Sequence, residues 1–211
     1  YIRTNGISTS ATAQASYRRR FGGELLKDMK TTDSKGWPHP DIVQWQDEAV
    51  ADIVRSFAAQ ARAARPKVVI SVDGHPYLPT DKPGTQGRND FWWAQEGWVD
   101  VIYSMDYARR LSWQKTEAIR AHLKRPEAAA IIVGNYEKTE TGKVVSREAR
   151  LVADLIGFCQ RKFPGNGVAL YWYGSLDDAQ MDALRAGPFR EAASPAWLRA
   201  ANRPGENRPH P

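Results

Sequence analysis

The chain has 211 residues, of which 42% are hydrophobic and 26% charged, as in an ordinary globular protein. This length can bury a sizeable core and fits one domain better than two. No apolar run reaches about 18 residues, which excludes a membrane span, and a single cysteine, Cys159, excludes an internal disulfide. The formal charge of +6 comes from scattered basic residues, with one tight cluster at Arg18–Arg20, so we expect no nucleic acid partner.

Two helices are predicted in the first part of the chain, because apolar residues recur there at helical spacing. The stripe of the first helix consists of Tyr17, Phe21, Leu25 and Met29. The second helix spans about 41–64, and its apolar face consists of Val50, Ile53, Val54, Phe57 and Ala61. The Arg65-Pro66 pair ends it.

Four apolar runs without polar alternation predict strands that are covered on both faces. They span 68–72, 99–105, 129–133 and 168–173. Helices are expected from about 112 to 124 and from 146, where Cys159 falls on the apolar stripe as a buried thiol. A further helix is expected after Asp177, which suits an N-cap, and the proline-rich tail over 200–211 is predicted to be disordered.

Strands that alternate with helices predict a parallel sheet, either open and doubly wound or closed into a barrel. Two features favour the barrel: no glycine-rich phosphate loop follows a strand, and the unusual residues gather after strand ends. Eight βα units close a barrel, and only about four are visible. The predicted fold class is therefore α/β, a partial (β/α)8 TIM barrel over 1–199 that holds the last four to five units.

Polar residues follow the run at 68–72. Asp73 comes directly after it and is interpreted either as a functional acid in the barrel mouth or as a turn aspartate beside Gly74. His75 is interpreted as a substrate ligand or a loop cap, and it lacks a partner at metal-ligand spacing, so no metal is expected. The long loop that follows carries Trp92 and Trp93, whose rings suit stacking on sugars, although one of two neighbours is expected in the core.

Acids and aromatic residues also follow the next strands. Asp106 and Tyr107 follow the second run, and Asp106 is either functional or neutralised by Arg109. Asn135-Tyr136-Glu137 follows the third run, and Tyr171-Trp172-Tyr173 closes the fourth. Glycoside hydrolysis requires two carboxyl groups, separated by about 5–5.5 Å for retention or about 6.5–9.5 Å for inversion. The candidate catalytic acids are Asp73, Asp106 and Glu137.

Several short motifs resemble the glycosyl-hydrolase-like 10 family. They are Tyr1-Ile2-Arg3, Ile70-Ser71-Val72, the loop rich in Gln and Trp before Gly97-Trp98-Val99-Asp100, and the stretch from Val101 to Tyr107. The similarity covers the chain from Tyr1 to about Leu198, and the stretch ending at Tyr107 is its most distinctive part. The family is related to chitinase-type and polysaccharide-deacetylase-associated hydrolases.

The resemblance implies a barrel hydrolase of O-glycosyl bonds in exported bacterial proteins, extracellular or periplasmic, without a metal or organic cofactor. When the family pattern is transferred to this chain, Arg3 is expected past the fourth strand of the complete barrel, as a substrate ligand. Asp73 is expected past the fifth strand, and Met105 and Tyr107 past the sixth. The family's fourth strand usually ends in an Asp, which here falls upstream of Tyr1 with the first βα units. If that Asp is essential, the fragment is expected to be inactive without the remaining half of the barrel. The family pattern does not require Asp106, whose candidate role follows from its position alone.

Three functions remain open. The first is a glycoside hydrolase acting on a poly- or oligosaccharide, with substrate contacts from Arg3, His75, Trp92, Trp93, Tyr107, Tyr136 and Trp172. The second is a non-catalytic carbohydrate-binding barrel that keeps the aromatic residues and lacks a working acid pair. The third is a basic module for polyanions, which requires Arg18–Arg20 and Arg109-Arg110 to form one patch and binding that weakens steeply with salt.

Overall fold

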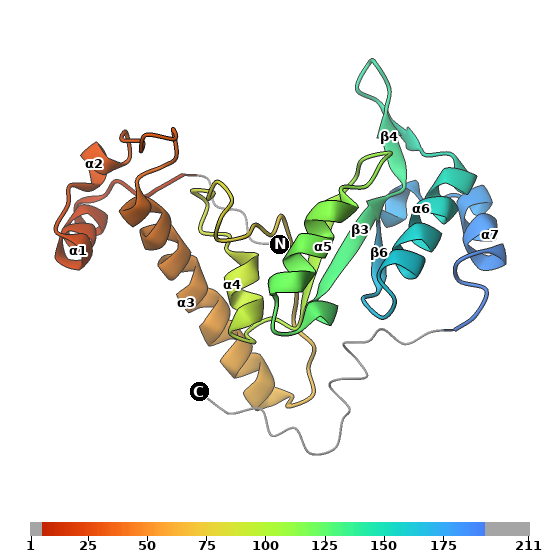
Figure 1. The fold of residues 1–211 in the computed structure, drawn as a ribbon, viewed down its shortest axis with the longest axis horizontal. Helices are drawn as coiled ribbons and strands as arrows, with labels where there is room; N and C mark the ends of the chain where they lie inside the picture. The colour runs from red at the N-terminus through yellow and green to blue at the C-terminus, as the bar shows by residue number, and fades with distance from the viewer. Residues whose placement is uncertain (1–5, 193–211) are drawn as a thin grey trace. The chain divides into compact units, whose positions relative to one another are not determined.

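The computed structural model describes residues 6–192 and divides into two compact units. Unit 1 comprises Tyr1–Val68 and Gly74–Val99, and unit 2 comprises Val69–Asp73 and Asp100–Pro211 (Figure 1). Arg3 and the tail over 200–211 lie outside the described residues. The chain is a mixed α/β protein in which helices accompany a parallel sheet of four strands. Within 6–192, no helix combines the length and apolar character that a membrane span requires.

Unit 1 is helical: α1 (Ala11–Phe21), α2 (Leu25–Asp28), α3 (Pro40–Ala64) and α4 (Asp90–Gln95). The predicted single helix through Met29 is wrong, because Gly22 takes a left-handed conformation with φ 76° and ends α1. Its N–H donates to the Arg18 carbonyl at 2.8 Å, which is the usual way for glycine to close a helix. Tyr17 and Leu25 still pack together with Ile42 in one core.

Helix α3 confirms the predicted second helix and begins one residue earlier, at Pro40. The Nδ1 atom of His39 accepts from the Asp41 N–H at 3.3 Å, and proline suits the first helical position. Its buried residues include Val50, Val54 and Ala58, whereas two members of the predicted apolar face are exposed. Those two are Ile53, exposed by 65%, and Phe57, exposed by 62%.

The sheet has the order β1-β2-β3-β6, with β1 (Ser71–Gly74), β2 (Val101–Asp106), β3 (Ala129–Gly134) and β6 (Val168–Tyr171). Strands β2 and β3 are parallel, and so are β3 and β6, as predicted from the alternation of helices and strands. Strand β1 begins later than the predicted run at 68–72. Just before β1, the Asp100 carboxylate accepts the Ile70 N–H at 3.0 Å, and the Ile70 carbonyl accepts the Asp100 N–H at 2.7 Å.

Helices α5 (Trp113–His122), α6 (Ala149–Lys162) and α7 (Asp178–Ala186) belong to unit 2, with short 3₁₀ turns at Pro126–Ala128 and Tyr173–Ser175. Helix α6 packs on β3 and β6, with α7 beside it (Figure 1). Their shared core confirms the predicted burial of Cys159; its members are Leu111, Ile131, Val133, Val152, Leu155, Ile156, Cys159, Phe163 and Leu184. Asp177 caps α7 as predicted. A small hairpin, β4 (Tyr136–Lys138) with β5 (Val144–Ser146), was not predicted.

The two faces of the sheet differ. Val133 belongs to the core under α6, and its register partners are Asp106 in β2 and Leu170 in β6. Because register partners in neighbouring strands point to the same side, these three residues share the helix-covered face. Gly134 and its partner Tyr171 follow on the opposite face, which we call the open face.

Candidate functional site

Four aromatic side chains gather where β2, β3 and β6 end. They are Tyr107, Tyr136, Tyr171 and Trp172, and we call them the aromatic cluster. Tyr107 and Tyr171 stack with ring centroids 5.0 Å apart and planes inclined by 20°. Tyr136 meets Tyr107 and Tyr171 at 6.0 Å and Trp172 at 5.7 Å, distances typical of favourable ring pairs. The cluster contains three of the predicted substrate ligands.

The cluster is accessible and is held by the backbone around it. Tyr171 is exposed by 43% and Trp172 by 37%, and the peptide bond between them is cis. Gly134 lets Tyr107 approach, since a Cβ on Gly134 would lie 3.1 Å from the Cβ of Tyr107. Large aromatic rings left in solvent at the end of a sheet provide a flat apolar surface for a ligand.

Two buried amide side chains, Asn135 and Gln180, hold the backbone of Trp172 in place. Asn135 and Gln180 are both fully buried, and the Nδ2 atom of Asn135 donates to Gln180 Oε1 at 3.1 Å. The same Nδ2 donates to the Trp172 carbonyl at 3.1 Å, and the Trp172 N–H donates to Asn135 Oδ1. Gln180 Nε2 donates to the carbonyls of Asn135 at 2.9 Å and Arg147 at 2.7 Å. Strand β6 therefore ends at Tyr171, earlier than predicted, because the Asn135 side chain forms the hydrogen bonds of the Trp172 backbone.

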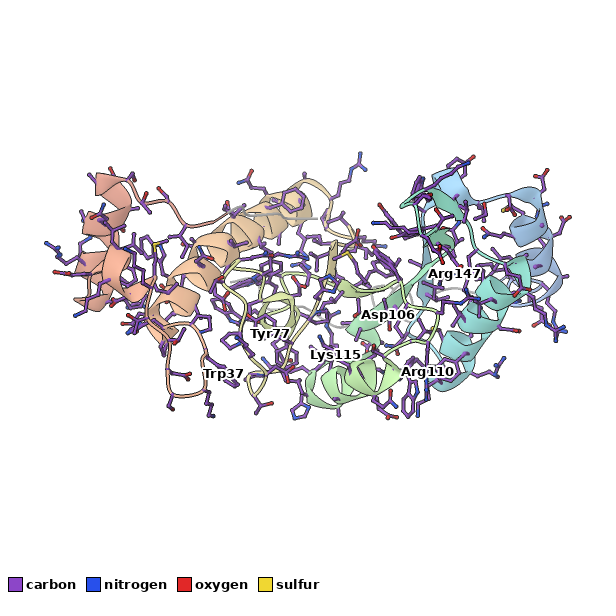
Figure 2. The ribbon with its side chains drawn as sticks, turned by 90° about the horizontal axis from the view of Figure 1, so that it is seen from above. Trp37, Tyr77, Asp106, Arg110, Lys115 and Arg147 are labelled. Atoms are coloured by element: carbon purple, nitrogen blue, oxygen red, sulfur yellow. The ribbon has the colours of Figure 1, made fainter. Side chains whose placement is uncertain are left out.

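Glu137 lies beside the cluster and contacts two arginines. Its Oε2 is 3.0 Å from Nη1 of Arg109, and its Oε1 is 3.3 Å from Nε of Arg147. Arg147, labelled in Figure 2, is only 5% exposed, and its fork donates to the carbonyls of Gly134 and Tyr107 at 2.8 Å each. Two arginines therefore hold the Glu137 carboxylate in place beside the cluster.

Asp106 lies on the helix-covered face, away from the open face on which Tyr171 lies. Its carboxylate accepts the backbone N–H groups of Ser112 and Ala108, which shapes the loop that leads into α5. It also lies near enough to Cys159, under α6, that its charge adds to burial in raising the pKa of that thiol to about 12. The basic neighbour Arg109 pairs with Glu137. The structure thus gives Asp106 a role in the loop and the helix layer.

Asp73 lies on β1, which forms one edge of the sheet, whereas β6 forms the other. Its charge contributes, after burial, to raising the pKa of the Tyr103 hydroxyl. Tyr103 is paired with Ala130, three positions before Val133, and so lies on the side opposite to the α6 core. Of the three candidate acids, Glu137 lies beside the aromatic cluster, whereas Asp73 lies on β1, the edge strand farthest from β6, which carries Tyr171.

The other predicted ligands belong to unit 1, apart from the cluster's own unit. His75 is exposed, Trp92 is half-buried and Trp93 is completely buried. This agrees with the prediction that one of the two tryptophans is a core residue. Trp92 packs against Trp98 with ring centroids 5.4 Å apart, and it lines a cavity within unit 1.

Unit 1 also holds two buried acids that sequence reasoning missed. Asp90, at the start of α4, is completely buried, and burial raises its pKa to about 7 against the opposing effects of Arg88 and the His75 backbone. Asp47, on α3, is 7% exposed, and burial raises its pKa too. Asn89 Nδ2 donates to its Oδ2 at 2.8 Å. The only sequence signal for Asp47 is a carboxylate next to the apolar stripe of a long helix.

No group of three or more His, Cys, Asp and Glu side chains within 6–192 has an arrangement that could hold a metal ion. Comparison with known proteins adds no relative: no protein-family model matches the chain, and neither a curated protein nor a solved structure matches it significantly. The residues and their geometry are therefore the basis for assigning a function.

Proposed function

We propose that unit 2 binds a poly- or oligosaccharide on the aromatic cluster. The proposal rests on the mutual contacts of four aromatic side chains: Tyr107, Tyr136, Tyr171 and Trp172. Two of them, Tyr171 and Trp172, are exposed by more than a third. A sugar ring presents C–H groups on its face and hydroxyls on its rim. The cluster supplies apolar area to that face, while Glu137 and Arg109 stand beside it as partners for hydroxyls.

Within this proposal the parallel sheet is the last part of a (β/α)8 barrel, and the open face is the inner wall. Support comes from the parallel pairing of β2, β3 and β6 and from the gathering of aromatic side chains at their carboxyl ends, where barrel sites lie. The resemblance of the stretch from Val101 to Tyr107 to the glycosyl-hydrolase-like 10 family points the same way.

The binding test compares Trp172→Ala with Tyr173→Ala in the full chain. Tyr173 is the adjacent residue, is exposed by 89%, and makes no ring contact with the cluster. Isothermal calorimetry against a panel of oligosaccharides should show about two- to tenfold weaker binding for Trp172→Ala and little change for Tyr173→Ala, because a stacked ring contributes roughly 0.5–1.5 kcal/mol beyond the area it buries. Equal losses in both variants, or no binding to any glycan by the unaltered chain, would contradict the proposal.

Glycoside hydrolysis is the second candidate, and Glu137 favours it, because this acid follows Tyr136 of the aromatic cluster and its Oε2 lies 3.0 Å from Nη1 of Arg109. Asp73, on β1, is the candidate for the second acid. In the two-carboxylate scheme, Glu137 attacks or stabilises the anomeric carbon while the second acid donates a proton to the leaving oxygen. Release of reducing ends by the unaltered chain, abolished in Asp73→Asn and in Glu137→Gln while binding persists, would establish it. Binding without release in all three proteins would leave the carbohydrate-binding function alone.

A further inference from the structure

The β4–β5 hairpin continues the chain beyond the end of β3 and takes part in the aromatic cluster (Figure 1). It contributes Tyr136, whose ring contacts Tyr171 and Trp172 at the end of β6. The register partner of Tyr136 is Ser146, whose Oγ donates to the Ser175 carbonyl at 3.0 Å, in the turn after β6. One face of the hairpin is therefore fixed against the end of β6, and this face carries the Tyr136 ring.

Lys138 lies on the same face of the hairpin as Tyr136. It is two residues further along β4, where its register partner is Val144 of β5. Side chains alternate between the two sides of a strand, so residues separated by two share a side. Two residues advance a strand by about 6.5–7 Å, which places the Lys138 backbone just beyond Tyr136. The long lysine side chain can therefore reach a sugar unit next to one that is stacked on the aromatic cluster.

The ammonium group of Lys138 has no counter-ion within residues 6–192. Lys138 is exposed and forms no ion pair in this part of the chain. The adjacent acid, Glu137, contacts Arg109 and Arg147 instead, at 3.0 and 3.3 Å. Glu140, in the turn of the hairpin, forms no ion pair with Lys138 either. An exposed cation beside a flat apolar surface suits a ligand that combines an apolar face with a negative charge.

We propose that the saccharide carries an anionic group, a carboxylate or a sulfate, and that Lys138 selects it by pairing with that group. This inference rests on the saccharide binding proposed above and adds the substrate class. A neutral saccharide gains the stacking and the hydroxyl contacts only. Because the pairing forms at an exposed site, salt should screen it, whereas stacking on the aromatic cluster should persist.

The test compares acidic oligosaccharides with their methyl esters, which keep the same sugars and linkages without the charge. Three pairs are titrated by calorimetry into the full chain: oligosaccharides of galacturonate, of mannuronate, and of glucuronate alternating with N-acetylglucosamine. In at least one pair the acid should bind about three- to tenfold more tightly than its ester, as expected for a charged contact near the surface. At about 1 M NaCl, where the Debye length is about 3 Å, this preference should disappear.

Lys138→Gln is the decisive variant, because it removes the charge and keeps a polar side chain of similar length. The ratio between the affinities for the acid and for the ester should fall to about one, and Lys138→Arg should retain the preference, since the cation is kept. Lys143→Gln is the matched control. Lys143 is an exposed cation of the same hairpin, and it directly precedes Val144, so it points to the opposite face. An unchanged ratio in Lys138→Gln, or an equal loss in Lys143→Gln, refutes the role of Lys138.

The outcomes also separate this inference from the proposed function. If the esters and other neutral oligosaccharides bind as tightly as the acids in every pair, the anionic substrate class is wrong and saccharide binding stands. If no saccharide binds, neutral or acidic, the proposed function fails and this inference fails with it. A sulfated galactan oligosaccharide extends the series: tighter binding of this probe than of every uronate assigns the anionic group to a sulfate, and weaker binding assigns it to a carboxylate.

Discussion

Arg147 lies under Glu137, with its Nε 3.3 Å from Glu137 Oε1, and it simultaneously donates to the backbone carbonyls of Gly134 and Tyr107. The buried guanidinium of Arg147 therefore contacts the end of β3, the loop after β2 and Glu137 in the β4–β5 hairpin, and it holds these three parts together. The position of Glu137 beside the aromatic cluster depends on this cation, because a buried arginine fixes several acceptors at once.

Arg147→Lys should destabilise the protein by about 2–3 kcal/mol, because an ammonium cannot reproduce the planar fork that reaches two carbonyls and Glu137. Urea unfolding followed by circular dichroism measures the change. Arg150→Lys is the control, since Arg150 lies in the first turn of α6 with its side chain 87% exposed; the free energy of unfolding should change by less than about 0.5 kcal/mol. Similar losses in both variants would show that the buried fork has no special role.

Gln180→Leu should cost about 1–3 kcal/mol of stability, because Asn135 loses its side-chain partner while it remains buried. The same change should weaken saccharide binding, since Asn135 holds the backbone of Trp172. Gln160→Leu serves as the control, because Gln160 is exposed and its side chain donates to the Pro188 carbonyl at 2.9 Å. Thermal melts combined with calorimetry separate the two effects. A stable Gln180→Leu with normal binding would contradict the role of the amide pair.

Asp90 should make stability fall as the pH rises. Its pKa is about 7 in the folded chain, whereas an unfolded aspartate titrates near about 4, so its favourable contribution is complete below about 4 and is lost as the pH passes about 7. The full difference is on the order of 4 kcal/mol. Asp90→Asn should remove most of this slope and increase stability at pH 8. Asp47, whose pKa is also raised, leaves a residual slope of the same sign.

Urea unfolding at a series of pH values from 4 to 8 measures this slope. Asp52→Asn, an exposed substitution on α3, should retain the slope of the unaltered chain. An Asp90→Asn protein that keeps the full slope would show that other groups are responsible.

Gly74→Ala should destabilise unit 1 by about 1–3 kcal/mol, because the new Cβ would overlap the Asp90 carboxylate. Gly84→Ala, where a Cβ meets nothing within 4 Å, should be neutral or slightly stabilising. If the overlap is the cause, the penalty should shrink on an Asp90→Ala background, which a double-mutant cycle of unfolding free energies detects. An unchanged penalty on that background would locate the cause elsewhere.

The sequence by itself determined the elements whose pattern is local. Apolar runs predicted β2, β3 and β6 close to their positions, and helical spacing predicted α3 and α6 with a buried Cys159. It also placed Tyr107, Tyr136 and Trp172 at strand ends, because parallel strands bring their carboxyl ends to one edge. These features could be predicted because hydrophobic periodicity and the order of the strands depend on residues that are close together along the chain.

Only the tertiary structure decided which side chains face one another. The register of β2 against β3 put Asp106 under α6, while Gly134 and Tyr171 continued on the open face, a difference of one residue that no composition reveals. Likewise Ile53 is exposed and Asp47 is buried on the same helix, because burial depends on which segments pack there. Contacts between segments that are far apart in the sequence determine which side chains are buried. Burial in turn shifts the pKa of a titratable side chain and limits its contact with a ligand.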